Sequence, residues 1–171
     1  MACAINIKAK NDVILPSLYD FFKKKEHIDC ILPIISGTST LSIRVLDWFV
    51  TNYAKTFNII LETNFNVYLD YKSQLRGYKK KMFDPFCRKR RIPFYYMDGK
   101  CIITTIGQLN FFKWAIQNKI IDYVINHLND IYQNMNLCSK NKSISSSTET
   151  SSDKNKSYIN IYKTEYFLIL D

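Results

Sequence analysis

The dipeptide Asp98-Gly99 lies between two strand-like runs and constrains the fold more than any other feature of this sequence. The run PFYYM before it and the run KCIIT after it are rich in the aromatic and β-branched residues that favour strands. Asp-Gly suits a type I′ turn, because both central residues of that turn need positive φ angles. The sequence therefore predicts a β-hairpin with strands over residues 92–97 and 100–104.

Helical signals follow this hairpin. A helix is predicted to begin at Thr104 or Thr105, and Thr105 with Gln108 three residues later matches a capping box. That helix is expected to run to Asn118, which would end it in a left-handed conformation. Apolar residues at helical spacing then predict a second helix over about 119–135.

The N-terminal half carries weaker signals. Residues 16–25 are typical of a short helix, and apolar spacing predicts another from residue 41 onward, with Ser39 or Thr40 as its cap. Residues 57–71 are rich in Phe, Ile, Tyr and Val, which indicates one or two strands.

Composition divides the chain into three parts. Residues 1–138 are expected to form a single α+β domain, in which a small antiparallel sheet packs against three or four helices. Eight of the ten residues 143–152 are Ser or Thr, so residues 139–157 are predicted to be a flexible linker. Residues 158–171 are apolar again and are expected to return to the hairpin sheet as a further strand.

No targeting segment stands out in the sequence. The first ten residues lack an apolar run, and no stretch of the sequence is long and apolar enough for a membrane span, so a secreted or membrane-spanning protein is not expected. Five scattered cysteines fit a reducing, intracellular compartment.

Charge is concentrated in one segment. Residues 72–91, here called the basic segment, hold nine basic residues and one acid, which accounts for +8 of the net charge of +9. Aromatic residues are interleaved with them. The candidate polyanion-binding residues are Lys72, Arg76, Tyr78, Lys79, Lys80, Lys81, Phe86, Arg88, Lys89, Arg90 and Arg91.

This segment admits several interpretations. Lys and Arg neutralise phosphates, and aromatic rings stack on unpaired bases, so nucleic-acid binding is the first. A solvated surface without a specific partner, a bipartite nuclear-import signal, an anionic membrane face and an acidic protein partner are the others. We favour nucleic acid or another polyanion, with a virion or scaffold protein that docks an acidic partner as the alternative.

Catalytic patterns are sparse, so a non-enzymatic protein without metal or cofactor is expected. Cys87 lies beside strong positive charge, which could make its thiol reactive, but a small buried residue next to Phe86 is the simpler interpretation. His27 and His127 are isolated, and the cysteines lack the paired spacing of a zinc site. No phosphate-binding or dinucleotide motif is present in the sequence.

Three blocks of the sequence carry a family resemblance: DWFVTNY, then KSQL with FDPFCR, then TT-x-GQLNFF-x-WAI. Together they resemble a family of small basic proteins encoded by nucleocytoplasmic large DNA viruses, including mimivirus-like genomes. The resemblance covers about residues 15–135. It implies a viral protein that acts in the host cytoplasm, in a viral replication compartment, in the nucleus or in the virion, and it transfers no catalytic residue.

Overall fold

The computed structural model of the chain describes residues 10–86, 90–97 and 99–145. Short helices dominate, and the strands form two small antiparallel sheets, which confirms the predicted α+β class. In chain order the elements are α1 (Lys10–Phe22), α2 (Lys25–Ser36), α3 (Ile43–Trp48), the π-helical turn η1 (Phe49–Tyr53), α4 (Ala54–Thr56), β1 (Ile60–Leu61), the 3-10 turn η2 (Glu62–Asn64), β2 (Phe65–Asn66), α5 (Val67–Tyr78), α6 (Lys80–Phe83), β3 (Arg91–Tyr96), β4 (Lys100–Thr105), α7 (Ile106–Gln117), α8 (Ile120–Asn126) and α9 (Leu128–Ser145).

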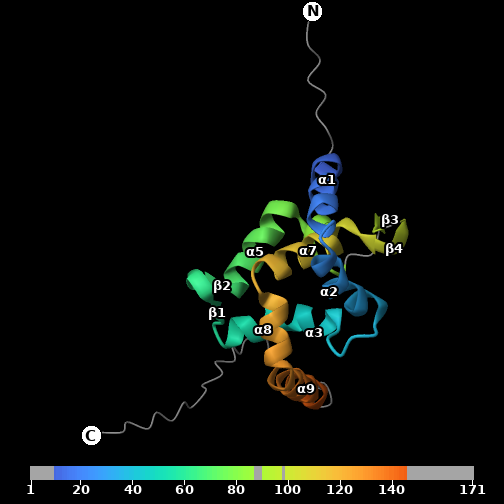
Figure 1. Ribbon diagram of the computed structural model, residues 1–171. Helices are drawn as coiled ribbons and strands as arrows, with labels where there is room; N and C mark the ends of the chain where they lie inside the picture. The colour runs from blue at the N-terminus through green and yellow to red at the C-terminus, as the bar shows by residue number, and fades with distance from the viewer. Residues whose placement is uncertain (1–9, 87–89, 98, 146–171) are drawn as a thin grey trace, which may run out of the picture.

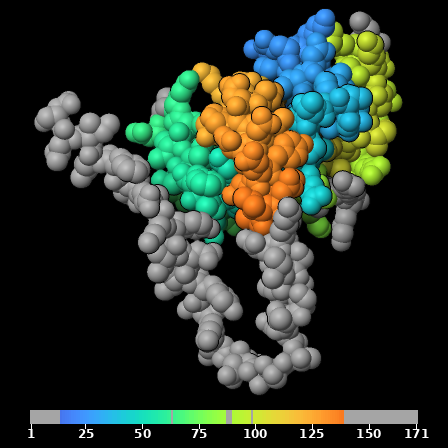
Figure 2. All heavy atoms as spheres, turned by 90° about the horizontal axis from the view of Figure 1, so that it is seen from below, coloured from blue at the N-terminus to red at the C-terminus, as the bar shows by residue number. Residues whose placement is uncertain are grey.

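Helix α7 lies at the middle of this arrangement (Figure 1). It contacts α1, α6, α8 and β4, so elements from both ends of the described chain meet on it. The β3–β4 hairpin lies on one side of α7 and the β1–β2 pair on the other. Seen from below, α8 and α9, in orange, lie between the green segment around β1 and β2 and the blue helices α1 and α2 (Figure 2).

The predicted hairpin is confirmed, with a longer turn. Strands β3 and β4 pair antiparallel from Arg91 with Thr105 to Tyr96 with Lys100. The last pair is Tyr96 with Lys100, whereas a two-residue type I′ turn at Asp98-Gly99 would pair Met97 with Lys100. Gly99 has a φ of +81°, a value that a residue without a Cβ adopts at little cost.

The predicted start of α7 is also confirmed. Thr105 is the N-cap, and its hydroxyl accepts a hydrogen bond from the backbone N–H of Gln108 at 3.1 Å. The side-chain oxygen of Gln108 accepts instead from the Thr104 hydroxyl at 2.7 Å. The predicted end was wrong in detail, because Asn118 keeps a φ of −102° and the left-handed residue is Lys119, at +54°.

The helix predicted over 119–135 is interrupted. It divides at His127, where α8 ends, and α9 continues through Ser145. The last turns of α9 therefore occupy part of segment 139–157, which we expected to be a linker. The rest of that segment and the expected strand at 158–171 lie outside the described residues.

The strands expected within 57–71 are much shorter than predicted. β1 and β2 pair only with each other, in a sheet separate from the hairpin. From Val67 the chain is helical, because the side chain of Asn66 accepts a hydrogen bond from the backbone N–H of Leu69 and caps α5. A local capping signal thus outweighs the strand-like composition of residues 67–71.

Two expectations for the N-terminal helices also need correction. The helix predicted over 16–25 spans Lys10–Phe22 instead, with Pro16 inside it. Apolar side chains on both sides of Pro16, Leu15 and Leu18, pack into or against the core and hold this helix. The cap of α3 is Ser42, rather than Ser39 or Thr40, and its hydroxyl accepts from the N–H of Val45 at 3.3 Å.

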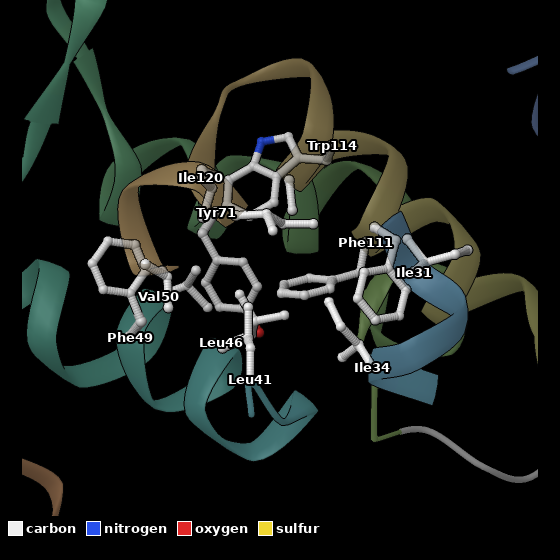
Figure 3. Packing of buried hydrophobic residues seen from close by; sticks show 14 of the residues in the cluster. Ile31, Ile34, Leu41, Leu46, Phe49, Val50, Tyr71, Phe111, Trp114 and Ile120 are labelled. Carbon is white, nitrogen blue, oxygen red and sulfur yellow. The ribbon is translucent and has the colours of Figure 1, made fainter. Parts of the chain in front are cut away.

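Four aromatic rings form the centre of the core. Tyr71 of α5, Phe83 of α6, and Phe111 and Trp114 of α7, here called the aromatic tetrad, have all six pairwise centroid distances between 5.5 and 6.3 Å. Such tilted and edge-to-face pairs are favourable beyond their burial. Figure 3 shows Tyr71 and Phe111 side by side with the indole of Trp114 beside them and Leu46 of α3 next to Tyr71.

Helices α6 and α7 approach each other more closely than side chains normally allow. A Cβ added to Gly107 would lie 3.1 Å from the carbonyl oxygens of both Lys81 and Asp84. One turn later, the buried Asn110 donates a hydrogen bond from Nδ2 to the carbonyl oxygen of Met82 at 3.0 Å. We call these contacts the α6–α7 interlock, and they fix the backbone of the basic segment against the core.

We expect Gly107→Ala to destabilise the protein by about 1–3 kcal/mol, because the new methyl group meets backbone atoms that cannot rotate away. Gly77→Ala is the matched control, since Gly77 lies within α5 and a Cβ there has open space. That change should stabilise by about 0.5–1 kcal/mol, as Ala does in a helix interior. Thermal unfolding of both variants measures the contrast, and equal melting temperatures would contradict the interlock.

Candidate functional site

The basic segment is folded into helices and a strand, and its charges face solvent. Lys72 and Arg76 lie on α5, Lys79 to Lys81 lie at and after the α5–α6 junction, and Arg90 and Arg91 lie at the start of β3. All seven of these side chains are exposed. Arg88 and Lys89 lie outside the described residues, as does Cys87.

Helical spacing on α5 separates charge from apolar surface. Tyr71, Leu75 and Tyr78 recur at the spacing of one helix face and pack in or against the core. Lys72 and Arg76 are four residues apart on a different face and remain in water. The helix is held by a hydrogen bond of 2.6 Å from the indole N–H of Trp114 to a carboxylate oxygen of Asp70.

The structure brings the two charge clusters of the basic segment to the same place, the start of α7. Arg91 pairs with Thr105, the N-cap of α7. Gly107, two residues later, touches the backbone of Lys81 through the α6–α7 interlock. Residues ten positions apart in the sequence therefore share one neighbourhood.

Lys79 has a strained backbone. Its φ of 65° and ψ of 156° lie in a region that is almost exclusive to glycine. Lys79 ends α5 with a hydrogen bond from its N–H to the carbonyl oxygen of Leu75, and it precedes α6. A lysine is therefore present where glycine would be less strained.

The exposed cations have few counter-charges. Among the residues that the structure describes, none of these seven cations forms an ion pair. Lys72 makes a cation–π contact, with its Nζ 5.7 Å from the centroid of the Tyr68 ring. The acid Asp47 interacts with one of these cations, Lys80. Burial and, to a smaller extent, the charge of Asp84 raise the pKa of Asp47 to about 6, while the charge of Lys80 lowers it.

Most aromatic residues within and beside the basic segment do not reach solvent. Tyr71, Phe83 and Phe94 are buried in the core, so they are not available to stack on a ligand. Burial, followed by the charges of Asp47 and Asp84, raises the pKa of the Tyr71 hydroxyl. Phe86 is 39% exposed and Tyr78 is half-buried, and these two remain candidates.

The two histidines have structural partners. Nδ1 of His27 lies 2.8 Å from the carbonyl oxygen of Phe21, and its ring stacks on Phe21. Nδ1 of His127 lies 2.9 Å from the carbonyl oxygen of Tyr123, again with stacked rings. In the described part of the chain, no group of His, Cys, Asp and Glu could hold a metal ion.

Sequence reasoning missed two surface hollows, because each is lined by residues distant in the chain. One of about 570 Å³ lies between the β1–β2 region and α8, beside an ion pair of 2.7 Å between Lys119 and Glu62. The second, of about 450 Å³, lies between α5, α6 and α7, with Gln74, Tyr78 and Asn110 in its lining. Only the second adjoins the basic segment.

Comparisons with known proteins agree with the motif resemblance. The model of a family of unknown function (DUF7197) matches residues 2–166. "Uncharacterized protein L507" of Acanthamoeba polyphaga mimivirus is 44% identical over 151 residues, which cover 76% of this chain and 58% of that protein. The predicted likeness to proteins of large DNA viruses is therefore confirmed, and the chain spans somewhat more than half the length of this relative. No solved structure matches the chain. None of the described helices has the length and apolar character of a membrane span.

We expect Asp47→Asn to stabilise the protein at pH 7.5 but not at pH 4. The folded carboxyl group holds its proton up to about pH 6, above its usual value of 3.8, so ionisation costs stability as the pH rises through this window. With allowance for solvent screening, the gain should be about 1–2 kcal/mol. Melting temperatures at the two pH values provide the measurement, and a gain of equal size at both would contradict the assignment.

Proposed function

This chain belongs to DUF7197, a family of unknown function, and we propose that it binds nucleic acid non-enzymatically through the basic segment. The observation that carries the proposal is the gathering of exposed cations around the start of α7. Seven basic side chains face solvent there and along α5, and the structure describes no ion pair for any of them. Phosphates are the ligands that such a surface attracts most strongly.

The fixed backbone supports this function over a passive charged surface. The α6–α7 interlock and the aromatic tetrad fix the backbone of Lys81 against Gly107, two residues from the Thr105 that pairs with Arg91. Like charges that are held together repel, and the phosphates of a polyanion neutralise them while counterions are released to the solvent. Electrostatics also allows an acidic protein partner, as in a virion or scaffold role, and the test below separates the two.

The test measures affinity against salt concentration. We expect the wild-type protein to bind labelled DNA with log K falling linearly with log salt between about 50 mM and about 200 mM. A variant in which Gln replaces Lys79, Lys80 and Lys81 together should have a shallower slope of log K against log salt. The expected change is about 2 to 3, about one for each phosphate contact.

The chain offers a matched control for this charge change. Lys23, Lys24 and Lys25 form a second exposed lysine triplet at the junction of α1 and α2, with Lys25 as the first residue of α2. Replacing them by Gln lowers the net charge equally and should leave the slope unchanged. Equal effects of the two triplets would contradict a defined site. No binding of DNA at low salt would contradict the proposal as a whole and favour the acidic protein partner.

Lys79→Gly separates stability from binding. Glycine relieves the strained backbone at this position, so we expect the protein to gain about 1 kcal/mol of stability. The same change removes one cation, so the salt slope should fall by about one. Thermal unfolding and the DNA titration together give the result. A variant that is more stable and binds with an unchanged slope would show that Lys79 makes no phosphate contact.

A further inference from the structure

The second hollow is lined by three residues of the basic segment, Gln74, Tyr78 and Phe83. Its volume is about 450 Å³, and residues of α5, α6, α7 and the turn after α7 line it. Tyr78 and Phe83 both line the hollow. Lys79 follows Tyr78 in the chain, and α6 runs from Lys80 to Phe83. We call it the amide hollow, because four of its lining residues are Gln74, Asn110, Gln117 and Asn118.

The amide groups of three of these residues are fixed by the protein itself. Gln74 donates its side-chain N–H to Asp70, Asn110 donates to the carbonyl oxygen of Met82, and Asn118 donates to the carbonyl oxygen of Trp114. Each of these amide nitrogens keeps a second N–H, and each amide oxygen can accept, so a ligand can use both. The hollow therefore offers preoriented amide groups to a ligand with a polar edge.

Aromatic rings complete the lining. Trp114 contributes from α7, and the half-buried Tyr78 lies parallel to Phe83, with 9° between the ring planes. Rings on a lining of this kind stack on planar ligands. Lys113 also lines the hollow and adds a positive charge, while its Nζ donates to the hydroxyl of Ser17 at 2.7 Å. A planar shape, a polar edge and a nearby negative charge together describe a nucleotide.

We propose that the amide hollow takes one unpaired nucleobase of a single nucleic-acid strand whose phosphates lie on Lys79–Lys81. The proposal rests on the proposed function, since the cations hold the strand beside the hollow. An unpaired base can present its donor edge to side-chain amides and its face to a ring. In a duplex, base pairing occupies that edge. The protein should therefore prefer single strands.

The test uses two probes of equal length and charge, an oligodeoxycytidine and an abasic strand. We expect the full-length wild-type protein to bind the oligodeoxycytidine more tightly than the abasic strand. Gln74→Ala combined with Gln117→Ala should weaken binding of the oligodeoxycytidine by about threefold to tenfold, the range for lost hydrogen bonds, and leave the abasic strand unaffected. Asn129→Ala with Gln133→Ala, two exposed amides on α9, is the matched control and should change neither.

The outcomes separate the two proposals. Equal binding of both probes by the wild-type protein, or an equal loss on both probes in the Gln variant, would overturn the base site and leave the phosphate site intact. No binding of either probe at low salt would overturn both.

A second measurement does not depend on those variants. In a Trp48→Phe background Trp114 is the remaining tryptophan, and the oligodeoxycytidine should quench its fluorescence more than the abasic strand does. Equal quenching by the two probes would contradict the base site.

Discussion

The aromatic tetrad is the contact on which the rest of the structure depends. Its four rings come from α5, α6 and α7, and each ring lies within 6.3 Å of the other three. Phe83 is the decisive member, because it lies within the basic segment and is fully buried. Burial of this ring stabilises α6 against α7, where the short helix would otherwise have too few hydrogen bonds to persist. The exposed lysines on either side are then held in place by an apolar anchor.

This anchor changes how the family motifs are understood. In FDPF, Phe83 and Pro85 are buried, and a carboxylate oxygen of Asp84 accepts a hydrogen bond from the backbone N–H of Phe86 at 2.8 Å. In GQLNFF, Gly107 permits close approach of the α6 backbone, and Asn110 hydrogen-bonds to it. The two motifs are thus the two sides of the α6–α7 interlock. Their described residues have structural roles, and the candidate ligand-binding side chains lie mainly beside them.

Electrostatics opposes part of this arrangement. Several cations are held close together, one of them at the strained backbone of Lys79, and Asp47 is kept partly out of water near Asp84. Each of these features costs stability, and apolar burial elsewhere offsets the cost. A surface that is unfavourable alone becomes favourable when an anion binds, so the same features that weaken the fold support the proposed function.

Local signals were readable from the sequence because their physics is local. The turn at Gly99, the Thr105 cap and the separation of charge from apolar residues each depend on a few neighbouring side chains, and the structure contains all three. Which aromatic residues are buried was decided only by the tertiary structure, because Phe83 meets Phe111 from far along the chain. The same holds for the amide hollow, whose lining comes from separate helices. The sequence by itself determined the kinds of local element and the amount of charge, whereas long-range packing decided where that charge is displayed.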